Sequence, residues 1–190
     1  KAGAGTLTLS GTNNHSGDWS ISDGTLVASG GSAIGNAAAV TLSGSGALQL
    51  SSSETIGALT GNGSAATDVT IDTGATLTAT YTADATFDGV IGGAGNFIKA
   101  GAGTLTLTGN NSYTGSTTVS AGGLTLNRAG GALNNFTAVT VSSGATLTVS
   151  AADTIGSISG AGTLALGGGA LTVGGDDTST TFSGAITGSG

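Results

Sequence analysis

The sequence predicts an all-β fold, a parallel β-helix (β-solenoid) with roughly 20 residues per coil. Three observations lead to this prediction: the chain is an internal duplication, its short apolar segments alternate with period two, and equivalent leucines return at nearly regular intervals. Self-similarity at a fixed period is the signature of repeat architectures, in which similar units stack on one another. We therefore expect an elongated stack of coils.

The duplication is evident at the start of the chain. Residues 1–9, Lys-Ala-Gly-Ala-Gly-Thr-Leu-Thr-Leu, return unchanged as residues 99–107, and the correspondence continues through the rest of the sequence. We divide the chain into a first repeat unit, residues 1–98, and a second unit, residues 99–190, that is continuous with the first. The second unit stops where another copy of the motif would follow, so we expect these residues to be a fragment of a longer array.

The alternating segments place Leu or Val at every second position and Thr between them. This pattern is typical of a strand with one buried face, with the aliphatic side chains pointing inward and Thr outward. Gly, Asn, Ser and Asp separate the segments, and these residues favour turns. No segment has helical spacing, so we expect almost no helix. Strands of this type are predicted at residues 6–9, 76–80, 139–141 and 146–149.

The spacing of the leucines sets the length of a coil. The equivalent residues are Leu7, Leu26 and Leu48 in the first unit, and Leu105, Leu124 and Leu147 in the second. They recur at intervals of roughly 20 residues, which is typical of one coil of a solenoid. Coils of a parallel β-helix pair at about 4.8 Å, so about nine or ten coils would form a rod about 45 Å long.

The alternative architecture is a tandem pair of immunoglobulin-like sandwiches of about 100 residues each. The absence of proline and of a linker-like composition near residues 95–100 argues against it.

Composition excludes several classes of function. Only 7% of residues are charged, the net charge is −7, and the chain has three Lys and Arg residues in total. So few cations cannot neutralise a phosphate backbone, and we expect no nucleic-acid partner. The absence of cysteine excludes disulfides and thiolate chemistry. No apolar run approaches the ~18 residues of a membrane-spanning helix, so we expect no direct membrane insertion of this segment.

A longer motif, residues 95–124, resembles the passenger-associated repeat of autotransporters, the type V secreted proteins of Gram-negative bacteria. It consists of Lys99 followed by Gly-x-Gly-Thr-Leu-Thr-Leu, an Asn-x-Tyr-x-Gly turn, a Thr-rich strand and Ala-Gly-x-Leu. The resemblance implies a right-handed β-helical passenger, displayed extracellularly or at the cell surface, with a C-terminal β-barrel translocator in the parent chain. The first copy departs from the motif at His15 and Trp19, where the second copy has Tyr113 and Thr117, and we interpret this as drift in a surface loop.

The titratable residues do not form a recognisable catalytic pattern. His15 is the only histidine, and Asp18 and Asp23 are nearby, but we expect it to be an exposed turn residue rather than part of a Ser-His-Asp triad. Paired carboxylates could support glycoside hydrolysis, yet we expect solvated turn residues at the candidate positions. These positions are Asp68, Asp72, Asp176 and Asp177.

Two other kinds of site are also not expected. Residues 92–97 begin like a calcium-binding nonapeptide but have Phe97 where the aspartate ligand should be. Outward threonines could form an ice-binding face, as at 76–80 and 104–108, but the Thr pairs do not recur on one register in every coil, and Thr is ordinary on a half-buried strand. We therefore expect no catalytic residue, no cofactor and no metal site.

The sequence favours a structural role over an enzymatic one. The leading hypothesis is a β-helical stalk that supports adhesion, self-association or secretion-coupled folding, with like molecules bound laterally or end to end, or host surface ligands, as partners. The alternatives are a repeated module of an extracellular filament or surface layer and, less favoured, the scaffold of a passenger hydrolase with its active site outside this segment.

Overall fold

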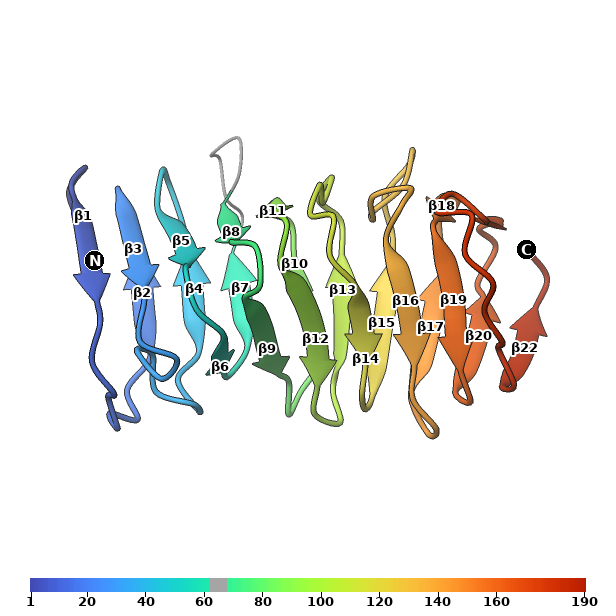
Figure 1. Cartoon of the computed structure of the whole chain (residues 1–190), viewed down its shortest axis with the longest axis horizontal. Helices are drawn as coiled ribbons and strands as arrows, with labels where there is room; N and C mark the ends of the chain where they lie inside the picture. Colours follow the sequence, from blue (N-terminus) through green and yellow to red (C-terminus); the bar gives the residue numbers. More distant parts are fainter. Residues whose placement is uncertain (62–67) are drawn as a thin grey trace.

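The computed structural model describes residues 1–61 and 68–190. In these ranges the chain forms strands and turns, and no helix is present that could cross a membrane. Residues 62–67 of the predicted first unit lie outside the described part. Figure 1 shows the strands side by side along the long axis of the molecule, with the two termini at opposite ends. The predicted β-helix is confirmed.

Within the described residues the strands form four parallel sheets. Sheet A contains β1 (Thr6–Leu9), β3 (Thr25–Ala28), β5 (Ala47–Leu50), β8 (Val69–Ile71) and β11 (Ile91–Gly93). Sheet B contains β2 (Trp19–Ile21), β4 (Val40–Leu42), β7 (Leu59–Gly61), β10 (Ala85–Phe87), β13 (Thr104–Leu107), β15 (Gly123–Leu126), β17 (Thr146–Val149), β20 (Thr163–Leu166) and β22 (Ala185–Gly188). Sheet C contains β6 (Glu54–Ile56), β9 (Thr76–Thr80), β12 (Asn96–Ala100), β14 (Thr117–Val119), β16 (Ala138–Val141) and β19 (Ser157–Gly160), and sheet D contains β18 (Asp153–Ile155) and β21 (Leu171–Val173).

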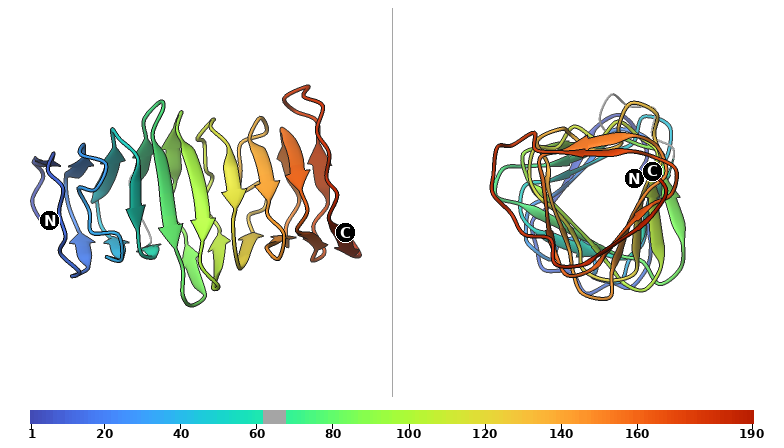
Figure 2. Two further views of the ribbon diagram at one scale, coloured as in Figure 1. Left: turned by 60° about the horizontal axis from the view of Figure 1, so that its bottom comes forward. Right: turned by 90° about the vertical axis from the view of Figure 1, so that its right-hand side faces the viewer.

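The cross-section of the rod is a triangle, as the end-on view in Figure 2 shows. The chain crosses the faces in one order, that of sheet A, then sheet C, then sheet B, as in the succession β8, β9, β10. Where a coil has no strand on one of these faces, a loop crosses the face instead. Sheet D continues the face of sheet A toward the C-terminus, because hydrogen bonds connect the coils between them. The N–H of Ile91 donates to the Asn111 side chain, the N–H of Asn111 to the carbonyl of Ala132, and the N–H of Ala132 to the Asp153 carboxylate. Three flat faces therefore surround one core that runs the length of the rod.

The leucines predicted to mark each coil stack on one another. Leu7 pairs with Leu26 and Leu26 with Leu48 in sheet A, and Leu105, Leu124 and Leu147 are paired in the same way in sheet B. All but one of these side chains are buried, and the exception is Leu7, which is 40% exposed because it lies in the first coil. Burial of aliphatic groups in this continuous core is the main stabilising contribution, at about 1.5 to 3 kcal/mol per side chain.

The sequence repeat does not coincide with a whole number of coils. β1 of the first motif lies in sheet A, whereas β13, which has the same sequence, lies in sheet B. The chain makes four complete coils from β1 to β11, then crosses sheet C in β12 before β13 begins. The boundary between the two repeat units falls inside β12, which pairs with β9 and β14 on either side. Equivalent features of the two units therefore face different directions.

Candidate functional site: the hydroxyl row and the repeat motif

One row of outward side chains follows the full length of sheet B, with one residue from each of its nine strands. The strand register aligns these positions from coil to coil. All of them except Ala165 carry a hydroxyl group, and neighbouring groups can bond, as Thr41 Oγ1 and Thr60 Oγ1 do at 3.1 Å. We call this set the hydroxyl row: Ser20, Thr41, Thr60, Thr86, Thr106, Thr125, Thr148, Ala165 and Thr187.

The Thr-x-Thr pairs do not recur on one register in every coil, as predicted, but single outward hydroxyl groups do recur, which the sequence analysis missed. Neighbours in the row are separated by different lengths of chain, with the shortest separation between Thr148 and Ala165 and the longest between Thr60 and Thr86. Turns at the corners absorb this variation, so the register is constant although the spacing is not. The outward positions two residues before the row on each strand include Gly123 and Ala185, which carry no hydroxyl group. The face therefore has one long row and no two-dimensional lattice of hydroxyl groups.

The hydroxyl row contains no charged side chain. The carboxylates nearest to it along the chain, Asp18, Asp84 and Asp88, each accept a hydrogen bond from the next coil. Asp84 accepts a hydrogen bond from the backbone N–H of Thr104 at 2.7 Å, and Asp88 accepts one from the hydroxyl of Thr108. Hydroxyl groups both donate and accept, so this face can form hydrogen bonds with a second polar surface without removing charges from water.

The residues weighed as a catalytic triad do not meet. His15 is exposed, and its Nε2 accepts a hydrogen bond from Trp19 Nε1 at 2.6 Å. Asp18 Oδ1 accepts from the backbone N–H of Ala39, and Asp23 Oδ1 accepts from Ser45 Oγ and the backbone N–H of Gly24. Each of the three side chains forms hydrogen bonds with a different partner. These contacts stabilise turns, and His15 is not hydrogen-bonded to either aspartate as a catalytic base would be.

Three of the other candidate carboxylates accept hydrogen bonds that join neighbouring coils. Ser157 Oγ donates to Asp176 at 2.7 Å, which holds the pKa of that carboxyl below its usual value, while Asp177 is the adjacent turn residue with a φ of 54°. Gln49 donates to Asp72. Asp68 differs from the prediction of a solvated residue: it is buried, and its Oδ2 accepts the backbone N–H of Val90 at 2.8 Å.

In residues 1–61 and 68–190, His, Cys, Asp and Glu side chains do not gather in groups of three or more that could hold a metal ion. Residues 92–97, which begin like a calcium-binding repeat, lead from β11 into β12.

The lysine that begins each motif forms a latch between two coils, a role that the sequence analysis missed. Lys99 is fully buried, and its Nζ donates to the backbone carbonyls of Gly101 at 2.7 Å, of Ala121 at 2.9 Å and of Gly103. Burial lowers the pKa of Lys99, and the charge of Asp84 opposes this effect. Because these carbonyls come from two successive turns, the ammonium group joins one coil to the next.

Lys1 repeats this geometry in the first unit. Its Nζ donates to the carbonyls of Gly3 at 2.5 Å and of Asp23 at 2.7 Å, and Asp23 occupies the position equivalent to Ala121. A glycine follows in each case, Gly24 or Gly122, with φ of 66° and 62°. A Cβ on Gly122 would lie 2.5 Å from the carbonyl oxygens of Gly101 and Gly103, so only glycine lets the turns close around the lysine.

Both latches lie within segments that match a known family. The family model described as the passenger-associated-transport-repeat matches residues 1–28 and 97–126. The chain contains two passenger-associated transport repeats. The predicted resemblance to autotransporter passengers is thereby confirmed, and a β-helical fold is consistent with it. Comparison with curated proteins gave no match, and neither did comparison with solved structures.

The two transport repeats differ at a coupled pair of residues. In the second repeat, the Tyr113 hydroxyl bonds to Thr117 Oγ1 at 2.5 Å, and both side chains are fully buried. In the first repeat the equivalent residues are His15 and Trp19, which also bond to each other across the same four-residue separation. The interpretation as drift in a surface loop is therefore incorrect for Tyr113, because this side chain belongs to the core and both members of the bonded pair differ together.

We expect Tyr113→Phe to lower the free energy of unfolding by about 1 to 2 kcal/mol, because it leaves the buried hydroxyl of Thr117 without its partner. Phe97 packs edge-on against the Tyr113 ring, and this contact is retained by phenylalanine. Urea unfolding followed by circular dichroism measures the change. His15→Ala, at the exposed equivalent position, should change stability by less than about 0.5 kcal/mol. An equal loss in both variants would contradict the assigned difference in burial.

Proposed function

We propose that the chain is a structural segment of an autotransporter passenger, displayed outside a Gram-negative cell, that associates laterally with like molecules through the hydroxyl row of sheet B. The observation that carries this proposal is the length of the row: seven consecutive strands of sheet B, from β2 to β17, each contribute one hydroxyl group, Ala165 separates them from an eighth on β22, and no member is charged. Identical rods placed side by side could form hydrogen bonds along their whole length. Many weak contacts in register would then combine into one stable contact.

The low charge of the chain supports association. With three cations and ten carboxylates distributed over 190 residues, long-range repulsion between two copies is modest at physiological ionic strength.

Sheet C offers a shorter row that Ile98 interrupts. Its members are Thr55, Thr78, Ile98, Thr118, Thr140 and Ser159. Sheet B is therefore the better surface. In this proposal the segment has no enzymatic activity of its own, because nine of its ten carboxylates accept hydrogen bonds that stabilise the fold.

Thr106→Lys combined with Thr125→Lys should abolish lateral association. The two positions are neighbours in the middle of the hydroxyl row, so two copies brought together there would place like charges opposite one another. Both substitutions make the net charge less negative, so a loss of association cannot be attributed to greater overall repulsion. Sedimentation velocity over a concentration series measures the effect, with an expected loss of at least about tenfold in the association constant.

The matched control places the same two substitutions on sheet C, at Thr78 and Thr118. This variant should associate as the original chain does. If it loses association and the sheet B variant keeps it, the assigned face is wrong. If particles of the original chain grow in length and not in thickness with concentration, end-to-end stacking of a filament module replaces the lateral contact.

A further inference from the structure

We propose that each repeat unit carries a surface groove that binds a neutral, linear oligosaccharide. The grooves form where a sheet is interrupted. Sheet C begins only at β6, and sheet A stops at β11 while sheet D starts at β18, so in each place two successive coils cross a face as loops. A groove lies on each pair of loops, with a volume of about 330 Å³ in the first unit and about 290 Å³ in the second.

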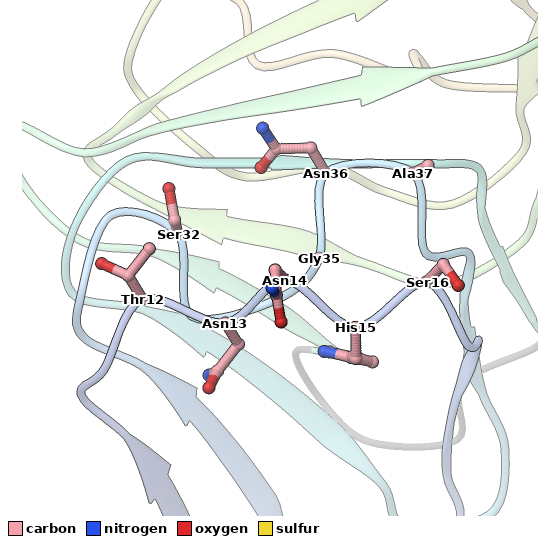
Figure 3. A pocket seen from close by; sticks show the side chains of 9 residues that line it. All are labelled: Thr12, Asn13, Asn14, His15, Ser16, Ser32, Gly35, Asn36 and Ala37. Carbon is pink, nitrogen blue, oxygen red and sulfur yellow. The ribbon is translucent and has the colours of Figure 1, made fainter.

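The two grooves are equivalent in the sequence repeat. Figure 3 shows the first, in which residues 12–16 of one coil lie against residues 32–37 of the next. The second is formed by residues 110–112 and 130–136. Asn13 and Asn111 are equivalent residues with the same structural task, since the side-chain amide of each donates to a backbone carbonyl of the following coil, Ala33 or Ala132. The recurrence shows that the groove is a property of the repeat unit and not an accident of one loop.

Each groove is lined by two asparagine side chains that the fold does not use. Asn14 and Asn36 in the first groove make no side-chain hydrogen bond within the described chain, and the same holds for Asn110 and Asn135 in the second. An asparagine amide offers two donors and an acceptor at once, which matches sugar hydroxyl groups. Free amides clustered in a groove are therefore available to a ligand rich in hydroxyl groups.

An aromatic ring adjoins each set of amides. In the second groove Phe136 is 64% exposed and directly follows Asn135, and in the first the exposed His15 lies across from Asn36. A flat ring presents an apolar surface that can pack on the C–H face of a pyranose, while the amides bond to its hydroxyl groups. The combination of an apolar platform and neutral amides matches the two kinds of surface on a sugar ring.

The grooves continue along the rod, which indicates a linear ligand. In the first unit a neighbouring hollow of about 450 Å³ shares Asn36 and Ala37 with the groove, and in the second a hollow of about 290 Å³ shares Gly130 and Asn135. The equivalent asparagines Asn36 and Asn135 thus lie at the junction of two hollows in both units. The negative charge of the protein disfavours binding of acidic sugars. No lysine or arginine of the described residues lines these hollows, and the chain carries a net charge of −7.

Titration calorimetry of the 190-residue chain with maltohexaose, cellohexaose and chitohexaose tests the proposal, with a hexamer of polygalacturonate as the acidic probe. We expect at least one neutral hexasaccharide to bind with two sites per chain. Asn36→Ala and Asn135→Ala should each remove one of the two sites, and the double variant should weaken binding at least about tenfold. Asn127→Ala, an exposed asparagine outside both grooves, should bind as the original chain does.

Absence of binding by all three neutral probes, or binding that survives in the double variant, would overturn the proposal, as would binding of polygalacturonate alone. Circular dichroism melting of each variant shows whether it is folded. If the double variant does not fold, Asn14→Ala with Asn110→Ala replaces it, with the same expected loss. Sedimentation of the groove variants should show unchanged lateral association, so failure here and failure of the hydroxyl row are separate results.

Discussion

Replacing Lys99 with methionine is expected to lower the free energy of unfolding by about 3 kcal/mol or more, because three backbone carbonyls lose a charged donor inside the protein. Methionine retains most of the apolar stem, so the loss reports on the ammonium group and not on packing. Urea unfolding followed by circular dichroism measures the difference. The large effect is expected because the latch joins two coils in the middle of the stack, where separation of the coils exposes core on both sides.

Lys1→Met is the matched control, since both lysines begin the same nine-residue motif. Lys1 is only partly buried and lies in the first coil, where water can replace its hydrogen bonds to Gly3 and Asp23. We expect a loss below about 1 kcal/mol. Equal losses in the two variants would mean that the latch acts within its own motif and does not depend on the coils on either side.

Leu105→Ala should destabilise the chain by about 2 to 5 kcal/mol, while the same change at Leu7 should cost less than about 1 kcal/mol. Both leucines occupy the same position of the same motif, but Leu105 is completely buried between β10 and β15, and Leu7 is 40% exposed. Truncation at Leu105 leaves a cavity between stacked coils. Truncation at Leu7 removes a group that is already partly in water.

Thermal or urea unfolding of the two leucine variants, measured side by side, gives the comparison. A loss at Leu7 as large as that at Leu105 would show that stability resides in each motif separately. Because the local sequence is identical, intrinsic strand propensity cannot explain a difference between them. We expect a difference in stability that depends only on the position of the leucine in the stack.

The sequence predicted those parts of the fold that depend on pattern. Strand 76–80 coincides with β9, and the spacing of Leu105, Leu124 and Leu147 gave the coil-to-coil register correctly. Alternation and spacing were sufficient here because a coil must return each inward side chain to the same face. The identical Lys1 and Lys99 were also visible as a signal, but the role of a lysine among backbone carbonyls depends on turns whose closure cannot be read from the sequence.

Other features required the three-dimensional register. The hydroxyl row was missed because the turns between its members differ in length, so Thr60 and Thr86 are neighbours in the sheet although they are the most widely separated pair of the row in sequence. The rotation of the second motif from sheet A to sheet B was missed because the sequence repeat gives the number of residues and not the number of coil faces. Asp68 was predicted to be solvated, but its acceptance of a backbone N–H from the next coil allows its burial.

Small-angle X-ray scattering at increasing dilution shows whether both repeat units belong to one continuous stack of coils. We expect a single rigid rod about 45 Å long in the dilute limit, because nine coils pair at about 4.8 Å. A profile of two compact bodies of equal size, joined flexibly near residue 98, would contradict it.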